Sequence, residues 1–146
     1  MTDHNRRDNS HLLLQFTDSH LCESAFAKLR GVVTVDCLEA VIRLAAKSFP
    51  SPDAAIVTGD ISHDGSPDSY RMMAERLRPI GGMQRFLPGN HDQPGVLRSI
   101  LNQTDWPTVD AVGDWRLIGL STHLPGHEGG RLDRSPLEAL ARQLCS

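Results

Sequence analysis

The stretch Leu87-Pro88-Gly89-Asn90-His91-Asp92 joins the end of a short apolar run to a sharp turn and three polar side chains. Its proline fixes one backbone angle and its glycine accepts conformations that other residues avoid, so a tight turn is expected there. An amide, an imidazole and a carboxylate follow directly, in Asn90, His91 and Asp92. This order is typical of a site at the end of a strand, and a polar loop between a strand and a helix is the alternative.

Two other apolar runs end in the same way. Residues 12–17 (LLLQFT) predict a strand that is buried on both faces, and Asp18 and His20 follow it. In extended chain, residues two apart point to the same side, so these two side chains are expected to converge. Residues 54–58 (AAIVT) predict a second buried strand, and Asp60 follows it after one glycine. The alternative for the first pair is a loop carboxylate beside an unrelated surface histidine.

Helical patterns separate these strands and indicate an α/β fold with a mostly parallel sheet and right-handed crossovers. In such sheets ligands bind outside the carboxyl ends of the strands, where all the polar groups above would meet. The expected elements besides those named are a helix from Thr34, its N-cap, to about residue 48; a helix with Ser66 as N-cap and Pro67 at its first position; a strand over 84–87; a helix over 94–101; a strand over 115–120; and a last helix opening with a capping box at 135–138.

Composition limits the classes of partner. The 146 residues are expected to form one domain, over 11–146, behind a disordered polar tail over 1–10. A net charge of −3 and few aromatic residues argue against a nucleic acid polymer as partner. No apolar stretch approaches the roughly 20 residues that span a bilayer. Three cysteines at unrelated spacings fit a reducing compartment, so we expect a cytoplasmic protein.

The polar groups at the strand ends suit a divalent metal. Asp18, His20, Asp60 and Asn90 together offer carboxylate, imidazole and amide ligands, which fit Mn, Fe or Zn. The lack of thiolates among them argues against a structural zinc site. A carboxylate on a central strand can bridge two ions, and ions roughly 3.5–4 Å apart are a common device for phosphoester hydrolysis. The sequence has no P-loop, which disfavours transfer from a nucleoside triphosphate.

Taken in order, the motifs Asp18-x-His20, Gly59-Asp60 and Gly89-Asn90-His91-Asp92 resemble those of the calcineurin-like metallophosphoesterases. Residues 59–66 (GDISHDGS), with 124–126 (LPG) and 129–132 (GGRL), are similar to the bacterial branch called class III cyclic-nucleotide phosphodiesterases. The resemblance runs from Leu12 onward. It implies an αββα sandwich, of which this chain would form the N-terminal half with its mostly parallel sheet.

The resemblance also implies the metal ligands. Two divalent ions, Fe, Mn or Zn, would be bound, the first by Asp18 and His20 and the second by Asn90, with Asp60 bridging both. A hydroxide held between them would attack the phosphorus of a 3′,5′-cyclic nucleotide such as cyclic AMP.

The catalytic roles are likewise implied by the resemblance. His91 would lie beside the phosphate, where it would stabilise developing charge or protonate the leaving oxygen. Asp92 would orient His91, and Asn90 would share with His91 the binding of the substrate.

The sequence departs from the family pattern after these motifs. The family's later metal-binding histidine and its Gly-His-x-His motif do not occur before Ser146, so we expect a truncated domain with an exposed sheet edge and metals short of imidazole ligands. For His63, His123 and His127 a surface loop position is favoured over a ligand role. The alternatives for function are another phosphoester substrate, or a catalytically inactive domain with a binding role, and oligomers are possible.

Overall fold

A computed structural model describes residues 10–104, 106 and 108–145. The disordered tail expected over 1–10 therefore lies outside the described residues, except for Ser10. None of the described helices is long and apolar enough to cross a membrane.

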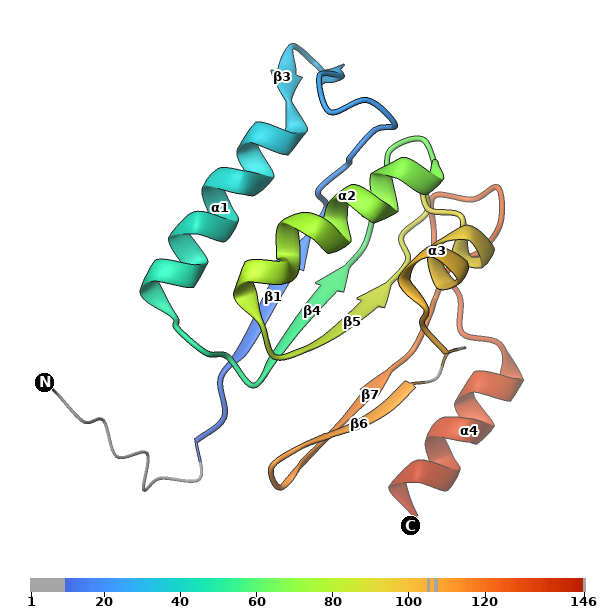
Figure 1. Cartoon of the computed structure of the whole chain (residues 1–146). Helices are drawn as coiled ribbons and strands as arrows, with labels where there is room; N and C mark the ends of the chain where they lie inside the picture. The colour runs from blue at the N-terminus through green and yellow to red at the C-terminus, as the bar shows by residue number, and fades with distance from the viewer. Residues whose placement is uncertain (1–9, 105, 107, 146) are drawn as a thin grey trace, which may run out of the picture.

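The centre of the fold is a parallel sheet of three strands in the order β1-β4-β5 (Figure 1). Its strands are β1 (Leu13–Thr17), β4 (Ala54–Thr58) and β5 (Met83–Leu87). Thr17 pairs with Thr58, and Thr58 pairs with Leu87, so the three strands end at the same level. This register brings the three polar turns to one edge, and the predicted parallel α/β arrangement is confirmed.

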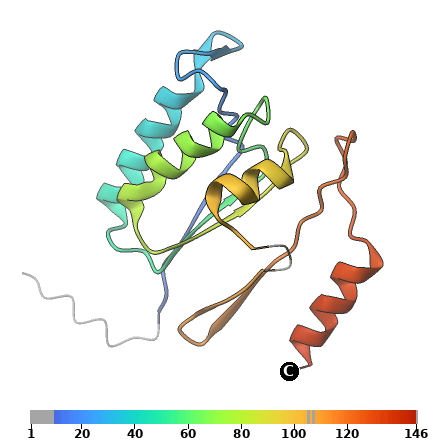
Figure 2. The same cartoon turned by 45° about the vertical axis from the view of Figure 1, so that its right-hand side comes forward.

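Three helices cover one face of this sheet, as both views show (Figures 1 and 2). They are α1 (Thr34–Ser48), α2 (Pro67–Leu77) and α3 (Pro94–Leu101), and a 3-10 turn, η1 (Arg78–Ile80), follows α2. Their apolar faces form the core with the inward side chains of the strands. The fully buried apolar members of the core cluster are Leu21, Ala55, Val57, Ile61, Tyr70, Met73, Leu77 and Leu97.

Of the three predicted helix N-caps, one is observed and two are not. Ser66 caps α2 by accepting from the Ser69 N–H, with Pro67 at the first helical position, as predicted. The predicted cap at Thr34 is wrong, because its hydroxyl donates to the carbonyl of His20 at 3.1 Å. The capping box at 135–138 is also wrong: α4 (Arg134–Leu144) begins one residue earlier, after Asp133, whose side chain makes no cap bond.

The other face of the sheet is largely open, so the prediction that residues 12–17 are buried on both faces is wrong. Leu14 and Phe16 face the helices, whereas Leu13 is 41% exposed, and Gln15 and Thr17 are exposed as well. A hairpin, β6 (Thr108–Val112) with β7 (Trp115–Gly119), borders this face across a groove of about 460 Å³. A strand's second face is buried only where another element packs on it. The hairpin borders this face without covering it, so the outward side chains of the strands line the groove.

The expected strand over 115–120 is therefore half of an antiparallel hairpin and no member of the central sheet. Its partner β6 comes from a stretch with a weak pattern. A second small hairpin, β2 (Lys28–Leu29) with β3 (Val32–Val33), lies between β1 and α1, where the sequence pattern predicts no helix or strand. None of the described side chains of α4 is buried, and α4 stands apart from the three other helices (Figure 2).

Candidate metal centre

The turns after β1 and β4 are fixed to each other by backbone hydrogen bonds. The His20 N–H donates to the carbonyl of Asp60 at 2.9 Å, and Leu21 N–H donates to that of Ile61 at 3.0 Å. Asp18 and His20 both have left-handed backbone, with φ of 54° and 45°, in place of the extended chain assumed from their spacing. The two side chains still converge, because the cross-strand bonds hold a turn that the chain would otherwise rarely adopt.

Asp18, His20 and Asp60 form a cluster whose ligand atoms all lie within 4.8 Å of one another. The His20 Nε2 lies 3.7 Å from the Asp60 Oδ2, and the hydroxyl of Thr17 donates to the Asp18 carboxylate. Two carboxylates and an imidazole at this separation fit a divalent cation, since Mn, Fe and Zn accept such mixed sets. The His20 Nδ1 is enclosed and has no hydrogen-bond partner in the described residues, which leaves this ring free to adjust toward a ligand.

Glycine at position 89 allows the β5 turn to approach this cluster. A Cβ at Gly89 would lie 2.2 Å from both the amide nitrogen and the Oδ1 of Asp60, far inside van der Waals contact. The amide of His91, two residues after Gly89, donates to the same Asp60 Oδ1 at 3.0 Å. This hydrogen bond fixes one oxygen of Asp60 and leaves the other facing His20. The β5 turn therefore orients the Asp60 carboxylate toward the cluster.

Asn90 is exposed and lines a cavity of about 340 Å³ next to this cluster. The cavity runs from Gly59 and Gly89 to the loop over 120–130, and His123 closes part of it through a 2.8 Å contact of Nδ1 with the carbonyl of Gly89. The cluster itself borders the cavity only through the two glycines beside Asp18 and Asp60. The structure thus brings Asp18, His20 and Asp60 together and puts Asn90 at the adjoining cavity.

Asp92 is fully buried and bonds to backbone. Its carboxylate accepts from the N–H groups of Ile61 at 3.1 Å, Ser62 at 2.9 Å and Gly89 at 2.8 Å. The expectation that Asp92 orients the His91 imidazole is corrected by these bonds, which tie the β5 turn to the β4 turn. Burial raises the pKa of Asp92, while the backbone N–H donors and the Tyr70 hydroxyl oppose that shift.

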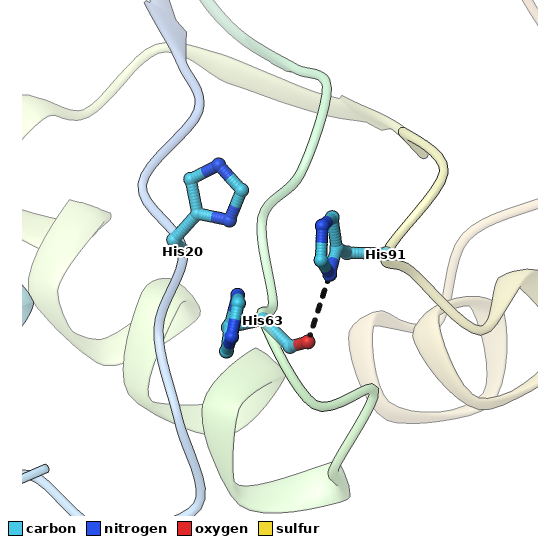
Figure 3. A group of neighbouring side chains, drawn as sticks. All are labelled: His20, His63 and His91. Carbon is cyan, nitrogen blue, oxygen red and sulfur yellow. Dashed lines mark hydrogen bonds between the residues drawn. The ribbon is translucent and has the colours of Figure 1, made fainter. Parts of the chain in front are cut away.

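His91 is instead oriented by the carbonyl of His63, which lies 3.1 Å from its Nδ1 (Figure 3). The rings of His63 and His91 are stacked with centroids 4.8 Å apart, and the His20 ring meets His91 edge-on at 5.2 Å. The surface position favoured for His63 is therefore wrong: the ring is half-buried and faces the site. Its place three residues after Asp60, inside the same turn, was the sequence signal for this.

Another carboxylate, Asp64, joins the β4 turn to the segment after β1. Burial alone would raise its pKa, but hydrogen bonds from Ser66, the Glu23 N–H and Ser62 outweigh that and lower the pKa to about 2. Burial also raises the pKa of Tyr70, whose hydroxyl accepts from the Gln93 N–H at 2.8 Å. The edge is therefore held by several independent polar contacts.

Three strand ends thus meet at a carboxylate–imidazole cluster. Residues 11–141 match the profile of the calcineurin-like phosphoesterases. The chain belongs to this family.

Its relatives include the 3′,5′-cyclic adenosine monophosphate phosphodiesterase CpdA of Pseudomonas aeruginosa, 35% identical over 95% of this chain and 52% of the relative. A probable cyclic nucleotide phosphodiesterase of Synechococcus is 34% identical over 90% of this chain and 52% of its own length. A cAMP/cGMP dual specificity phosphodiesterase of Mycobacterium tuberculosis is 30% identical over 99% of this chain and 48% of its own length. The phosphoesterase chain thus spans about half the length of these relatives.

Proposed function

We propose that this chain acts in the hydrolysis of a 3′,5′-cyclic nucleotide such as cyclic AMP. The observation that carries the proposal is the convergence of Asp18, His20 and Asp60 at the carboxyl edge of the sheet, beside the cavity lined by Asn90. The cavity, about 340 Å³, is within the size range of small-molecule sites. Relatives whose names state this activity support the choice of substrate class.

Two divalent ions, Fe, Mn or Zn, are proposed to be held by Asp18, His20, Asp60 and Asn90. When bound, such ions lower the pKa of water and neutralise phosphate charge. The chain's own contribution is to fix the ligands: the His91 N–H holds one Asp60 oxygen, and the turn bond to Asp60 fixes the backbone of His20.

His91 is proposed to hold the proton that the reaction needs. A carbonyl can only accept, so the contact with His63 requires a proton on the His91 Nδ1. When the ring is cationic, its Nε2–H would donate to a phosphate oxygen or protonate the departing ester oxygen. Asn90 would donate its amide to the same phosphate, and Asp92 would act as a positioning residue through the backbone of the turn.

We also propose a reducing, cytoplasmic setting and a single domain over 11–146. Cys22, Cys37 and Cys145 are all free thiols, and two of them are exposed, which supports a reducing compartment. The proposed partner is a small phosphoester.

The proposal is tested by assaying the purified chain, loaded with Mn²⁺, on cyclic AMP and on an activated phosphodiester. Asp60→Ala is the site variant, and Asp133→Ala, an exposed carboxylate paired with Arg131, is the matched control. We expect hydrolysis by the unmodified chain and by Asp133→Ala, and at least a tenfold lower rate, roughly, for Asp60→Ala. A rate for the unmodified chain equal to that of Asp60→Ala would contradict the proposal.

A further inference from the structure

Three imidazoles from three different turns face a common space beside the carboxylate cluster. His20 follows β1, His63 follows β4 and His91 follows β5, and each offers a ring nitrogen within 4.8 Å of the other two (Figure 3). His63 lies 5.5 Å from His20 between ring centroids, closing the triangle with the two contacts described above. This group shares His20 with the carboxylate cluster and adds two nitrogen donors that the cluster does not use.

The backbones that carry the three rings are pinned. The His63 N–H donates to the carbonyl of Leu21 at 2.7 Å, and the carbonyl of His20 accepts from the hydroxyl of Thr34. The His91 N–H is bonded to Asp60. The main chain is fixed at each position, so rotation of the rings is enough to change the distances between their nitrogens. The fold has therefore already ordered the backbone that a metal site would need.

The contacts of the three rings leave one nitrogen of each ring available to a shared ion. His91 donates from Nδ1 to a backbone carbonyl, so its Nε2 carries the lone pair in the neutral ring, and metal-binding histidines are commonly held this way. The His20 Nε2 faces the Asp60 carboxylate at 3.7 Å, which leaves Nδ1 as the nitrogen available to the other two rings. That Nδ1, with the Nδ1 of His63, is enclosed without a hydrogen-bond partner in the described residues.

We propose that His20, His63 and His91 form a second metal site, one with three imidazole ligands and a preference for Zn²⁺, Cu²⁺ or Ni²⁺. Imidazole suits these ions, whereas carboxylate and amide oxygens suit Mn²⁺ better. Ligand nitrogens at about 2.0–2.1 Å from a tetrahedral ion are roughly 3.4 Å apart, so ring rotations of modest size complete the site. Coordination also gives the two enclosed nitrogens the partner they lack, which removes the cost of leaving them unsatisfied.

The site competes with the carboxylate cluster for His20. A neutral imidazole has one lone pair. His20 can therefore bind an ion together with the carboxylates through Nε2, or an ion together with the other imidazoles through Nδ1, but not both at once. An ion bound by the three imidazoles therefore displaces Mn²⁺ from its His20 ligand. The proposal stands on the geometry of the three rings, and its test uses no hydrolysis.

The test is a titration of the metal-free chain with Cu²⁺, followed by electron paramagnetic resonance. We expect one ion whose hyperfine pattern reports three imidazole nitrogens. In His63→Gln the pattern should lose one nitrogen, and the affinity should fall at least roughly tenfold. Asp18→Asn, which removes a ligand of the carboxylate cluster alone, and His127→Gln, which removes an exposed loop imidazole, should leave pattern and affinity unchanged. An unchanged pattern in His63→Gln, or its loss in Asp18→Asn, would overturn the proposal.

A second measurement needs no variant and so does not depend on how His63→Gln folds. Zn²⁺ is added to the unmodified chain with nitrogen-labelled histidine, and the ring nitrogens are followed by nuclear magnetic resonance. Large shifts confined to the rings of His20, His63 and His91 support the site. Shifts that leave out His63 would overturn it.

Discussion

The carboxyl edge of the β1-β4-β5 sheet and the segment from β6 to α4 differ in how deeply their side chains are buried and in how many hydrogen bonds hold them. At the edge, backbone groups of three turns bond to one another and to carboxylates, and the buried Asp92 accepts from three N–H groups. In the later segment, the side chains of α4 are not buried, and Leu144 is 71% exposed.

Polar contacts also act in the later segment. Arg85 of β5 makes a two-pronged contact with Asp110 of β6, and within the segment Arg116 of β7 donates to the carbonyl of Gln143 at 2.6 Å. The site edge is therefore held by hydrogen bonds among the described residues, while the open sheet face and α4 leave apolar side chains exposed. We therefore expect substitutions at the edge to cost more stability than those in the later segment.

The largest effect is expected for Asp92→Ala. The change leaves the buried N–H groups of Ile61 and Ser62 and the half-buried N–H of Gly89 without an acceptor. A buried group left unsatisfied costs about 1–3 kcal/mol, so the two buried groups alone should lower the free energy of unfolding by about 2–6 kcal/mol. Urea unfolding measures it, with Asp133→Ala of the later segment as control, since that side chain is 67% exposed. Equal losses of unfolding free energy in the two variants would contradict the claim that the site edge contributes more to stability than the later segment.

The next effect is expected for Gly89→Ala. The added Cβ would meet Asp60 at 2.2 Å, so the turn or the carboxylate must move, at a cost of about 1–3 kcal/mol and with weaker metal binding. Gly129→Ala is the matched control in the later segment, because a Cβ there meets nothing within 4 Å. Thermal melting compares the two, and a control that loses as much as Gly89→Ala would count against a tightly packed edge.

A smaller effect is expected where the two regions join. Arg85→Ala removes the contact with Asp110, which is only 11% exposed, and a double-substitution cycle of the pair should give a coupling of about 1 kcal/mol. Amides of β6 and β7 should then exchange faster while those of the β4 turn do not. The pair Arg134 and Glu138 on α4 is the control, and its i,i+4 coupling should be about 0.3–0.5 kcal/mol.

The smallest effect concerns pH. Asp64 has a folded pKa of about 2, below its ordinary value near 3.9, so its stabilisation is complete above that ordinary value and is lost as pH falls toward 2. The side chain is exposed, so water reduces the size of the effect. The stabilities of the unmodified chain and Asp64→Asn, measured against pH, should therefore approach each other between the ordinary pKa and pH 2. Subtracting one curve from the other removes the opposite contribution of Asp92, whose raised pKa favours the folded state at low pH.

The strand ends and their polar clusters could be predicted because buried apolar runs stop where the chain turns. Asp18, His20 and Asp60 come together as those runs suggested. The partners of Asp92 could not be predicted, because backbone N–H groups leave no trace in the residue types. The place of His63 in the turn after Asp60 indicated a position near the site, but the backbone bond to Leu21 that fixes it joins distant segments and could not be predicted.

The open face of the sheet illustrates a second limit of sequence patterns. An apolar run such as residues 12–17 indicates a buried strand, but whether both faces are covered depends on elements elsewhere in the chain. Here the helices cover one face, and Leu13 stays 41% exposed on the other. The strand β6 was missed for a related reason, since only its ends, Thr108 and Val112, are buried.

Equilibrium binding of Mn²⁺ tests the central claim most directly, namely that the three strand ends of this chain form a metal centre by themselves. Free Mn²⁺ is followed by electron paramagnetic resonance as it is titrated into the unmodified chain, Asp60→Asn and Asp110→Asn. We predict saturable binding that weakens at least roughly tenfold in Asp60→Asn and is unchanged in Asp110→Asn, whose carboxylate pairs with Arg85 away from the cluster. Binding that is absent from the unmodified chain, or equal in all three proteins, would contradict the account.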